Sequence, residues 1–141
     1  MTLSGLDRFC MPDQLATRVF TDIHCHCLPG LDDGPRSMGE ALLLCQALVE
    51  DGITEVIATP HQLGRFDGCC DAPSVRRAVA QLNQTLRQSD IVLTVLPGAD
   101  VRLDERILPL LEADNVLTAG DGGLYLLLEP VSYTHLRAHE T

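Results

Sequence analysis

The stretch Thr21–Gly34, TDIHCHCLPGLDDG, indicates both the fold and the chemistry of this chain. Its beginning is predicted to be a strand, because the apolar residues Phe20 and Ile23 favour extended backbone. Side chains two positions apart on a strand point to the same side of it. The imidazoles of His24 and His26 can therefore reach a single metal ion from this strand.

A turn and a pair of carboxylates follow the two histidines. Pro29-Gly30 is predicted to form the turn, and Gly34 closes the segment after Asp32 and Asp33. Nitrogen and oxygen ligands together suit Zn, Mn or Fe. The H-x-H pair alone could be two histidines at a strand end, but H-x-H followed seven residues later by D-G predicts a metal site.

The composition restricts the classes of partner and the location. The chain has 141 residues, enough for one small domain with a core, and a net charge of −10. We expect no nucleic-acid partner, because phosphate contacts need clustered Lys and Arg and this chain has no Lys. No apolar run could span a bilayer and the start MTLSGLDRFCMPDQ is no signal peptide, so a cytoplasmic protein without membrane insertion is expected.

The six cysteines are predicted to be free thiols. Their spacing is irregular, and nothing in the sequence indicates an oxidising compartment. Cys25 and Cys27 alternate with the histidines, so they should face away from the metal site and pack in the interior.

Apolar patterning predicts alternating strands and helices after a lead-in over residues 1–17. Strands are expected over residues 18–24, 55–59, 91–96 and 124–128, and helices over 37–52, 72–89 and 105–113. The first helix opens with a capping box, Ser37 with Glu40. Asp104 can cap the third helix, which Pro109 should kink or delay.

Each predicted strand ends at a potential metal ligand. The first ends at His24 and His26, the second at His61, the third at Asp100 and the fourth at Glu129. The order β-α-β-α-β-α-β implies parallel strands covered by helices, whose chemistry collects at the carboxyl ends of the strands. The simpler alternative is that polar residues merely follow strands, but that would not favour His, Asp and Glu each time.

Four segments carry a resemblance to a known family. VFTDIHCHCLPGLDDGPRSMGEAL, DGITEVIATPH, LPGADVRL and LYLLLEP resemble the PHP superfamily (polymerase and histidinol phosphatase), above all its bacterial manganese-dependent tyrosine-protein phosphatases of capsule and exopolysaccharide systems. The resemblance implies an α/β fold, the N-terminal half of a distorted (β/α)7 TIM-like barrel, with a partial PHP domain over residues 18–130. The tail 131–141 does not resemble the family.

The resemblance also implies a trinuclear metal centre, with manganese first and iron or zinc as alternatives. Carried over to this chain, its ligands would be His24 and His26 for the first metal, Asp33 and His61 for another, Asp100 as the bridge between two metals, and Glu129. Asp100 stands where the family usually has Glu, so either the backbone moves inward or the bridge weakens. Asp32 and Glu40 are expected to be capping or supporting residues, and the further ligands of the family barrel are absent from this chain.

The function implied by the resemblance is phosphomonoester hydrolysis on phosphotyrosine proteins, with a bacterial tyrosine kinase of polysaccharide synthesis as the expected partner. Clustered metals would hold the phosphate and lower the pKa of a water for in-line attack. Arg65 and Arg102 are candidates for phosphate contacts, although both could be ordinary surface residues. A homo-oligomeric state is left open.

Three alternatives remain beside this interpretation. One is another PHP-type hydrolase, such as a histidinol-phosphate phosphatase, and another is a non-catalytic fragment. A third is a cysteine-dependent phosphatase, because Cys70 and Arg76 have C-x5-R spacing, although Pro73 and the lack of Gly inside the loop argue against it.

The tail VSYTHLRAHET resembles translated adapter sequence and suggests a truncated gene model. Its His135 and His139 have a spacing that can bind zinc on a helix, but we expect no role for them. An open half-barrel would leave sheet edges unpaired and an apolar flank exposed, so the chain alone is predicted to be poorly soluble and inactive.

Overall fold

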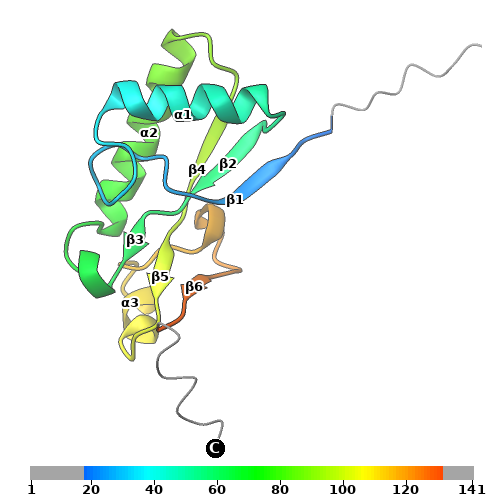
Figure 1. Ribbon diagram of the computed structural model, residues 1–141. Helices are drawn as coiled ribbons and strands as arrows, with labels where there is room; N and C mark the ends of the chain where they lie inside the picture. The colour runs from blue at the N-terminus through cyan, green and yellow to red at the C-terminus, as the bar shows by residue number, and fades with distance from the viewer. Residues whose placement is uncertain (1–17, 132–141) are drawn as a thin grey trace, which may run out of the picture.

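The computed structural model describes residues 18–131, so the predicted lead-in and the tail histidines His135 and His139 lie outside the described residues. Strands and helices alternate along the chain (Figure 1). The elements are β1 (Thr21–Cys25), α1 (Met38–Glu50), β2 (Glu55–Ala58), β3 (His61–Gln62), η1 (Gly64–Phe66), α2 (Ala72–Gln88), β4 (Thr94–Pro97), β5 (Asp100–Arg102), α3 (Ile107–Glu112), η2 (Ala119–Asp121) and β6 (Leu127–Glu129).

All the strand pairs are parallel, as predicted. They form two small sheets, ordered β1-β2-β4 and β3-β5-β6. β3 continues the path of β2, and β5 continues that of β4, which gives two strands that the sequence did not predict. The first interruption contains Pro60, which has no N–H for a neighbouring strand. The second contains Gly98, where an added Cβ would lie 2.6 Å from Ile57 Cγ2.

The described strands also differ from the predicted ones at their boundaries. β1 begins at Thr21, later than predicted. β4 begins at Thr94, because the backbone N–H of Ile91 still donates to a carbonyl at the end of α2. β6 covers only residues 127–129, because the carbonyl of Tyr125 accepts a hydrogen bond from Ala119 rather than from a neighbouring strand. Each predicted strand was therefore correct in place and wrong in extent.

The helices follow their capping residues. Ser37 Oγ accepts a hydrogen bond from the Glu40 N–H at 3.2 Å, as the capping box predicts. The Glu40 carboxylate, however, accepts from the N–H of Arg36 at 2.8 Å and not from that of Ser37. α3 begins only at Ile107, because the Asp104 carboxylate accepts from the Arg106 N–H at 2.8 Å and so holds the preceding residues in a turn.

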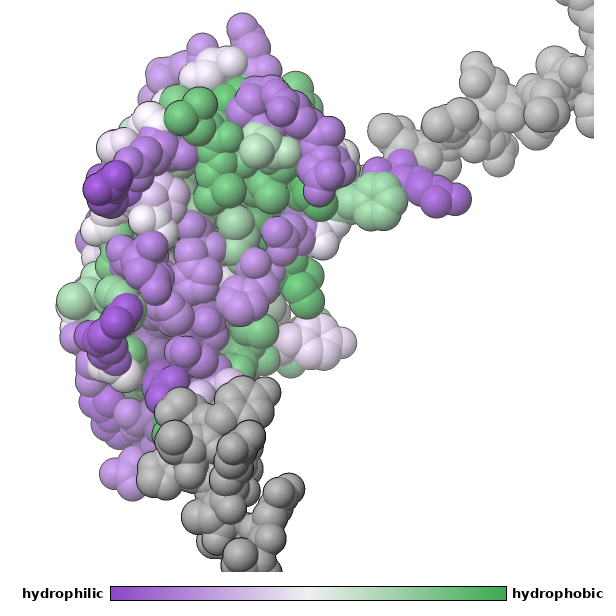
Figure 2. All heavy atoms as spheres, viewed as in Figure 1, coloured by the Kyte–Doolittle hydropathy of each residue, from purple (hydrophilic) through white to green (hydrophobic). Residues whose placement is uncertain are grey.

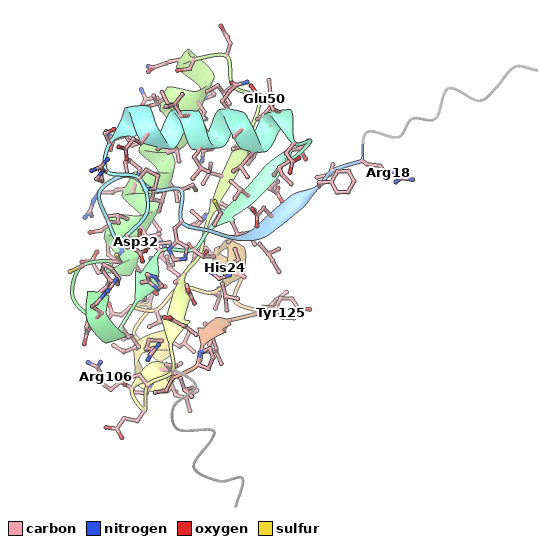
Figure 3. All side chains as sticks on the ribbon, in the orientation of Figure 1. Arg18, His24, Asp32, Glu50, Arg106 and Tyr125 are labelled. Carbon is pink, nitrogen blue, oxygen red and sulfur yellow. The ribbon has the colours of Figure 1, made fainter. Side chains whose placement is uncertain are left out.

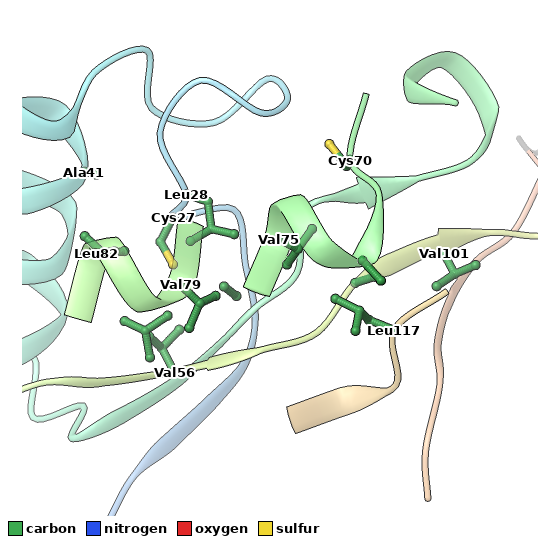
Figure 4. Packing of buried hydrophobic residues seen from close by; sticks show 14 of the residues in the cluster. Cys27, Leu28, Ala41, Val56, Cys70, Val75, Val79, Leu82, Val101 and Leu117 are labelled. Carbon is green, nitrogen blue, oxygen red and sulfur yellow. The ribbon is translucent and has the colours of Figure 1, made fainter. Parts of the chain in front are cut away.

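One hydrophobic core joins α1 and α2 to the strands (Figure 4). The buried face of α2 is the predicted one, Val75, Val79, Leu82 and Leu86. Cys27 is fully buried in this core, which agrees with its predicted packing role. Burial of these side chains fixes the positions of the strands, and with them the residues at the strand ends.

Part of the surface beside β1 and β6 is apolar. Val19, Phe20 and Ile23 lie at or near β1, and Leu124 and Tyr125 precede β6; each is more than half exposed. Figure 2 shows apolar surface on the side where β1 projects. Within the described residues, β1 and β6 each pair with a single neighbouring strand. The helices of this part of the chain are too short or too polar to cross a membrane.

Candidate metal centre

The loop after β1 folds back onto the histidines that precede it. Gly30 adopts a φ of +72° and donates its N–H to the carbonyl of Pro35 at 2.8 Å, which closes the turn. Gly34 passes so close to the strand end that an added Cβ would lie 2.5 Å from the carbonyl oxygen of His26. Only glycine fits there, and this close approach brings Asp32 and Asp33 beside the imidazole of His26.

All six residues predicted as metal ligands lie together, although they come from four separate segments of the chain. Their ligand atoms form three overlapping groups, each compact enough to surround one ion. The groups are His26, Asp32, Asp33 and His61; His24, His26 and Asp100; and His61, Asp100 and Glu129. Figure 3 shows the labelled His24 and Asp32 near the middle of the molecule, where the side chains of the strand ends converge.

The distances inside this cluster fit shared metal ions better than hydrogen bonds. Asp100 Oδ2 lies 3.4 Å from His24 Nε2 and 3.5 Å from His61 Nδ1. The same His61 nitrogen lies 3.4 Å from Glu129 Oε2. Hydrogen bonds of this kind have shorter lengths, about 2.7–3.0 Å. Two atoms bound to one metal ion at about 2.1 Å are about 3.0–3.5 Å apart in octahedral or tetrahedral geometry.

Asp100 is the central residue of the cluster. Its side chain is only 7% exposed, and within residues 18–131 it is the one carboxylate near all three histidines. Its N–H donates to the carbonyl of Pro60 at 2.9 Å, which ties the start of β5 to the interruption before β3. β4 ends at Pro97 and β5 begins at Asp100, so this residue lies directly after the interruption that contains Gly98.

Asp32 supports the cluster through hydrogen bonds to its residues. Its side chain is 1% exposed, and Oδ2 lies 2.7 Å from His26 Nδ1. The same carboxylate accepts hydrogen bonds from the backbone N–H groups of His61 and Gly34, each at 3.0 Å. With its Nδ1–H donated to Asp32, a neutral His26 keeps Nε2 free for a metal ion on the side of Asp100.

This pair shifts both pKa values. The hydrogen bond to Asp32 raises the pKa of His26 above its ordinary value and outweighs the lowering effect of burial. Burial raises the pKa of Asp32. The hydrogen bonds from His26 and from the two backbone N–H groups lower it by more, so the pKa of Asp32 lies below its ordinary value. Asp32 is therefore a carboxylate at neutral pH despite its burial.

Both predicted arginines border a cavity of about 390 Å³ beside the cluster. Arg65 Nη2 lies 3.7 Å from Asp33 Oδ2, with a side chain that is 77% exposed. Arg102 Nη1 lies 3.4 Å from Glu129 Oε1. Asp33, His61 and Glu129 also line this cavity, so it opens directly onto the candidate ligands.

Phe66 is a residue of this site that sequence reasoning missed. Its ring stacks on His61 with centroids 5.1 Å apart and planes 3° apart, and Arg65 lies over it, with Cζ 4.8 Å from the centroid. The only signal in the sequence was an aromatic residue in the loop that follows His61, next to an arginine. That signal is weak without knowledge of how the loop returns.

The cysteine-dependent alternative does not fit this geometry. The Cys70 thiol is buried, lies 3.2 Å from the carbonyl of Leu31, and has its pKa raised to about 11, mainly by burial. A nucleophilic cysteine needs a lowered pKa. Arg76 is instead paired with Asp114 and Asp121, at 2.7 and 2.8 Å, so it does not serve a phosphate loop.

Comparisons with known proteins identify a family and relatives that this chain resembles. A family model described as "Capsular polysaccharide synthesis, CpsB/CapC" matches residues 20–138. The tyrosine-protein phosphatase YwqE of Bacillus subtilis (strain 168) is 38% identical over 109 residues, which are 77% of this chain and 42% of YwqE. The tyrosine-protein phosphatase CpsB of Streptococcus pneumoniae is 27% identical over 122 residues, 85% of this chain and 49% of CpsB.

A solved structure supports the fold. It comes from crystal structures of YwqE and CpsB, described as metal-dependent tyrosine phosphatases, and matches with a TM-score of 0.75 at 33% identity. The match covers 84% of this chain and 49% of the solved chain. The predicted α/β fold with parallel strands is thereby confirmed. The chain spans about half the length of the relatives that it matches or slightly less.

Proposed function

This chain belongs to the CpsB/CapC family of capsular polysaccharide synthesis proteins, and on that premise we propose that it is part of a metal-dependent protein-tyrosine phosphatase. The reaction is hydrolysis of the phosphate monoester of phosphotyrosine proteins that regulate capsule or exopolysaccharide synthesis. The observation that carries the proposal is the cluster of six candidate ligands beside a cavity bordered by two arginines.

The donor set suits divalent transition metals, with manganese first and iron or zinc as alternatives, because it combines imidazoles and carboxylates. When bound, such ions supply a Lewis acid for the phosphate oxygens and activate a water for attack on phosphorus. Asp100 holds the centre of the ligand set. Asp32 supports it by fixing the tautomer and the direction of the His26 ring.

The two arginines are proposed to bind the phosphate. Both guanidinium groups line the cavity next to the candidate ligands, and Arg geometry allows two parallel hydrogen bonds to one phosphate. Arg102 lies in β5 with a side chain that is 30% exposed, so its position is the more restricted. Arg65 is more exposed, and it would approach the phosphate from η1, the short helix after β3.

We also propose that the described residues are the N-terminal half of a distorted (β/α)7 barrel, with a partial PHP domain over residues 18–130. Two observations support this arrangement. The strands are parallel and the outer strands β1 and β6 each have a single neighbour, and the chain matches about half of a solved relative. The complete barrel would add strands and further ligands. The chain by itself is expected to bind metal and to lack activity.

The proposed partner is a phosphotyrosine protein, specifically a bacterial tyrosine kinase of polysaccharide synthesis. The proposed location is the cytoplasm, which the free thiols of Cys25, Cys27, Cys45, Cys69 and Cys70 support, because such thiols persist in a reducing compartment. The net charge of −10 argues against a nucleic-acid partner.

A chimera tests the function. Residues 20–130 of this chain would replace the matching part of YwqE, and hydrolysis of a phosphotyrosine peptide would be measured with Mn²⁺ and with a chelator. We expect chelator-sensitive activity on the peptide and much weaker activity on histidinol phosphate. The substitution His61→Ala should lower the activity at least roughly 100-fold, and Cys70→Ser should retain it. A folded, manganese-loaded chimera that hydrolyses histidinol phosphate but not the peptide would favour the other PHP-type phosphatase.

A further inference from the structure

The turn after β3 carries an aromatic side chain into the wall of the cavity. Leu63 and Gly64 have φ angles of +65° and +59°, which reverse the chain directly after Gln62. A Cβ on Gly64 would lie 2.9 Å from Cγ of Arg102, so the turn packs closely on that side chain. The short helix η1 that follows ends at Phe66, whose ring lines the cavity of about 390 Å³.

The ring of Phe66 is held in place. It lies parallel to the imidazole of His61, with 3° between the planes. It also lines a second, smaller cavity of about 150 Å³, which Leu110 and Val116 border as well. Phe66 and Leu63 therefore border both cavities, and the larger one is also bordered by candidate ligands.

The larger cavity has a charged part and an apolar part. Asp33, His61 and Glu129 belong to the charged part, and Leu63 with Phe66 to the apolar part. A phosphate bound near the charged part and between the arginines leaves its ester group facing the apolar part. Arg65 adds its planar guanidinium, 4.8 Å from the ring centroid of Phe66, and such a group also stacks on aromatic rings.

We propose that Phe66, extended by Arg65, is the surface against which the phenol ring of the substrate lies, and that Phe66 makes this site select aryl over alkyl phosphates. The inference rests on the proposed phosphatase function. Aromatic pairs interact at centroid distances of about 4.5–7 Å, and a ring attached directly to the phosphate reaches that far. A short alkyl ester, such as that of phosphoserine, presents no ring to this surface.

The test is a binding experiment on the full 141-residue chain loaded with Mn²⁺. Dissociation constants for phenyl phosphate and ethyl phosphate would be measured by calorimetry for the wild type and for Phe66→Leu. Phe20→Leu is the matched control, because Phe20 is 53% exposed at the start of β1 and does not line the cavity. Circular dichroism and the Mn²⁺ affinity check that each variant is folded, and Phe66→Met replaces Phe66→Leu if that variant unfolds.

We expect the wild type to prefer phenyl phosphate, and Phe66→Leu to reduce this preference by about fivefold while ethyl phosphate binds within about twofold of the wild type. Phe20→Leu should leave both constants unchanged. An unaltered ratio, or an equal loss for both esters, overturns the role of Phe66 while leaving the phosphatase proposal intact. A manganese-loaded wild type that binds neither ester overturns the inference, whereas the proposed function is tested separately by the activity of the chimera with YwqE.

Discussion

At the scale of single residues, the site depends on Asp32 although it is not predicted to bind metal. Its carboxylate accepts hydrogen bonds from one imidazole and two backbone N–H groups and is almost completely buried. Such supporting carboxylates fix the ring of a ligand histidine, and their loss typically weakens metal binding about 10- to 100-fold.

The substitution Asp32→Asn tests this support in the metal-free chain. The pKa of His26 lies above 6.5 in the folded state, so its pairing with Asp32 stabilises the fold fully below pH 6.5 and is lost as the pH rises through the folded pKa. The pKa of Asp32 lies below 3.8, so its contribution is present above pH 3.8 and is lost as the pH falls through its folded pKa. We expect Asp32→Asn to lower the pKa of His26, as measured by NMR titration of the imidazole.

The NMR experiment has a matched control. Asp67→Asn removes an equal charge from a half-exposed carboxylate that pairs with Arg106 and is not among the candidate ligand groups. It should leave the His26 titration unchanged. An unshifted His26 in Asp32→Asn would mean that the hydrogen bond at 2.7 Å does not control the ring.

Gly64 is a second residue whose identity matters. Its φ of +59° disfavours any side chain, and the added Cβ would meet Arg102. We expect Gly64→Ala to destabilise the chain by about 1–2 kcal/mol in urea unfolding. Gly68→Ala is the control, because it has a similar positive φ of +81° but nothing within 4 Å, so it isolates the backbone cost from the contact. Equal destabilisation by the two substitutions would remove the argument from packing on Arg102.

At the scale of elements, the interruptions between β2 and β3 and between β4 and β5 decide where the ligands lie. Gly98 allows the second interruption to pack against Ile57 of β2. We expect Gly98→Ala to cost about 1–3 kcal/mol of unfolding free energy, because the new methyl group overlaps a packed side chain and cannot move. Gly122→Ala is the control, since its nearest contact would be 3.7 Å. If Gly98→Ala were as stable as the wild type, the segment around Gly98 could move away from Ile57 of β2 without a cost in stability.

The elements also show what could be predicted from the sequence. The apolar face of α2 has a clear helical period, and its four residues are the buried ones. β3 and β5 are two and three residues long, too short to carry any period, so the sequence predicted one strand where the structure has two. His61 and Asp100 were predicted at the carboxyl ends of strands, but they are the first residues of β3 and β5, shortly after the ends of β2 and β4. They still lie together as predicted, because parallel strands bring their carboxyl ends to one edge. Phe66 was not, because its stacking on His61 depends on a turn with two positive φ angles.

At the scale of the whole molecule, the described residues expose apolar side chains beside the two outer strands. Ile23 is 62% exposed on β1, and Tyr125 is 74% exposed before β6. Parallel sheets are normally buried on both faces and paired at their edges. The half-barrel proposal accounts for this exposure, because the remaining strands of the proposed barrel would cover these side chains.

The isolated chain should therefore associate with itself. We expect sedimentation velocity to show species larger than a monomer of 15.3 kDa, together with binding of an apolar dye. The double substitution Ile23→Ser and Tyr125→Ser should reduce both signals, whereas Leu43→Ser, which alters an equally exposed residue of α1, should not. A monomeric wild type that binds no dye would contradict the half-barrel proposal.

Side chains from four segments of the chain are proposed to form one metal centre around Asp100. The most direct test of this proposal is equilibrium dialysis of the full chain against Mn²⁺, with bound metal counted by mass spectrometry. Asp100→Asn is compared with the wild type, and Asp104→Asn serves as a control of equal charge outside the candidate ligand groups. We predict that the wild type and Asp104→Asn bind Mn²⁺ equally and that Asp100→Asn binds at least about tenfold more weakly. Equal binding by the wild type and Asp100→Asn would mean that Asp100 is not a ligand of the metal centre.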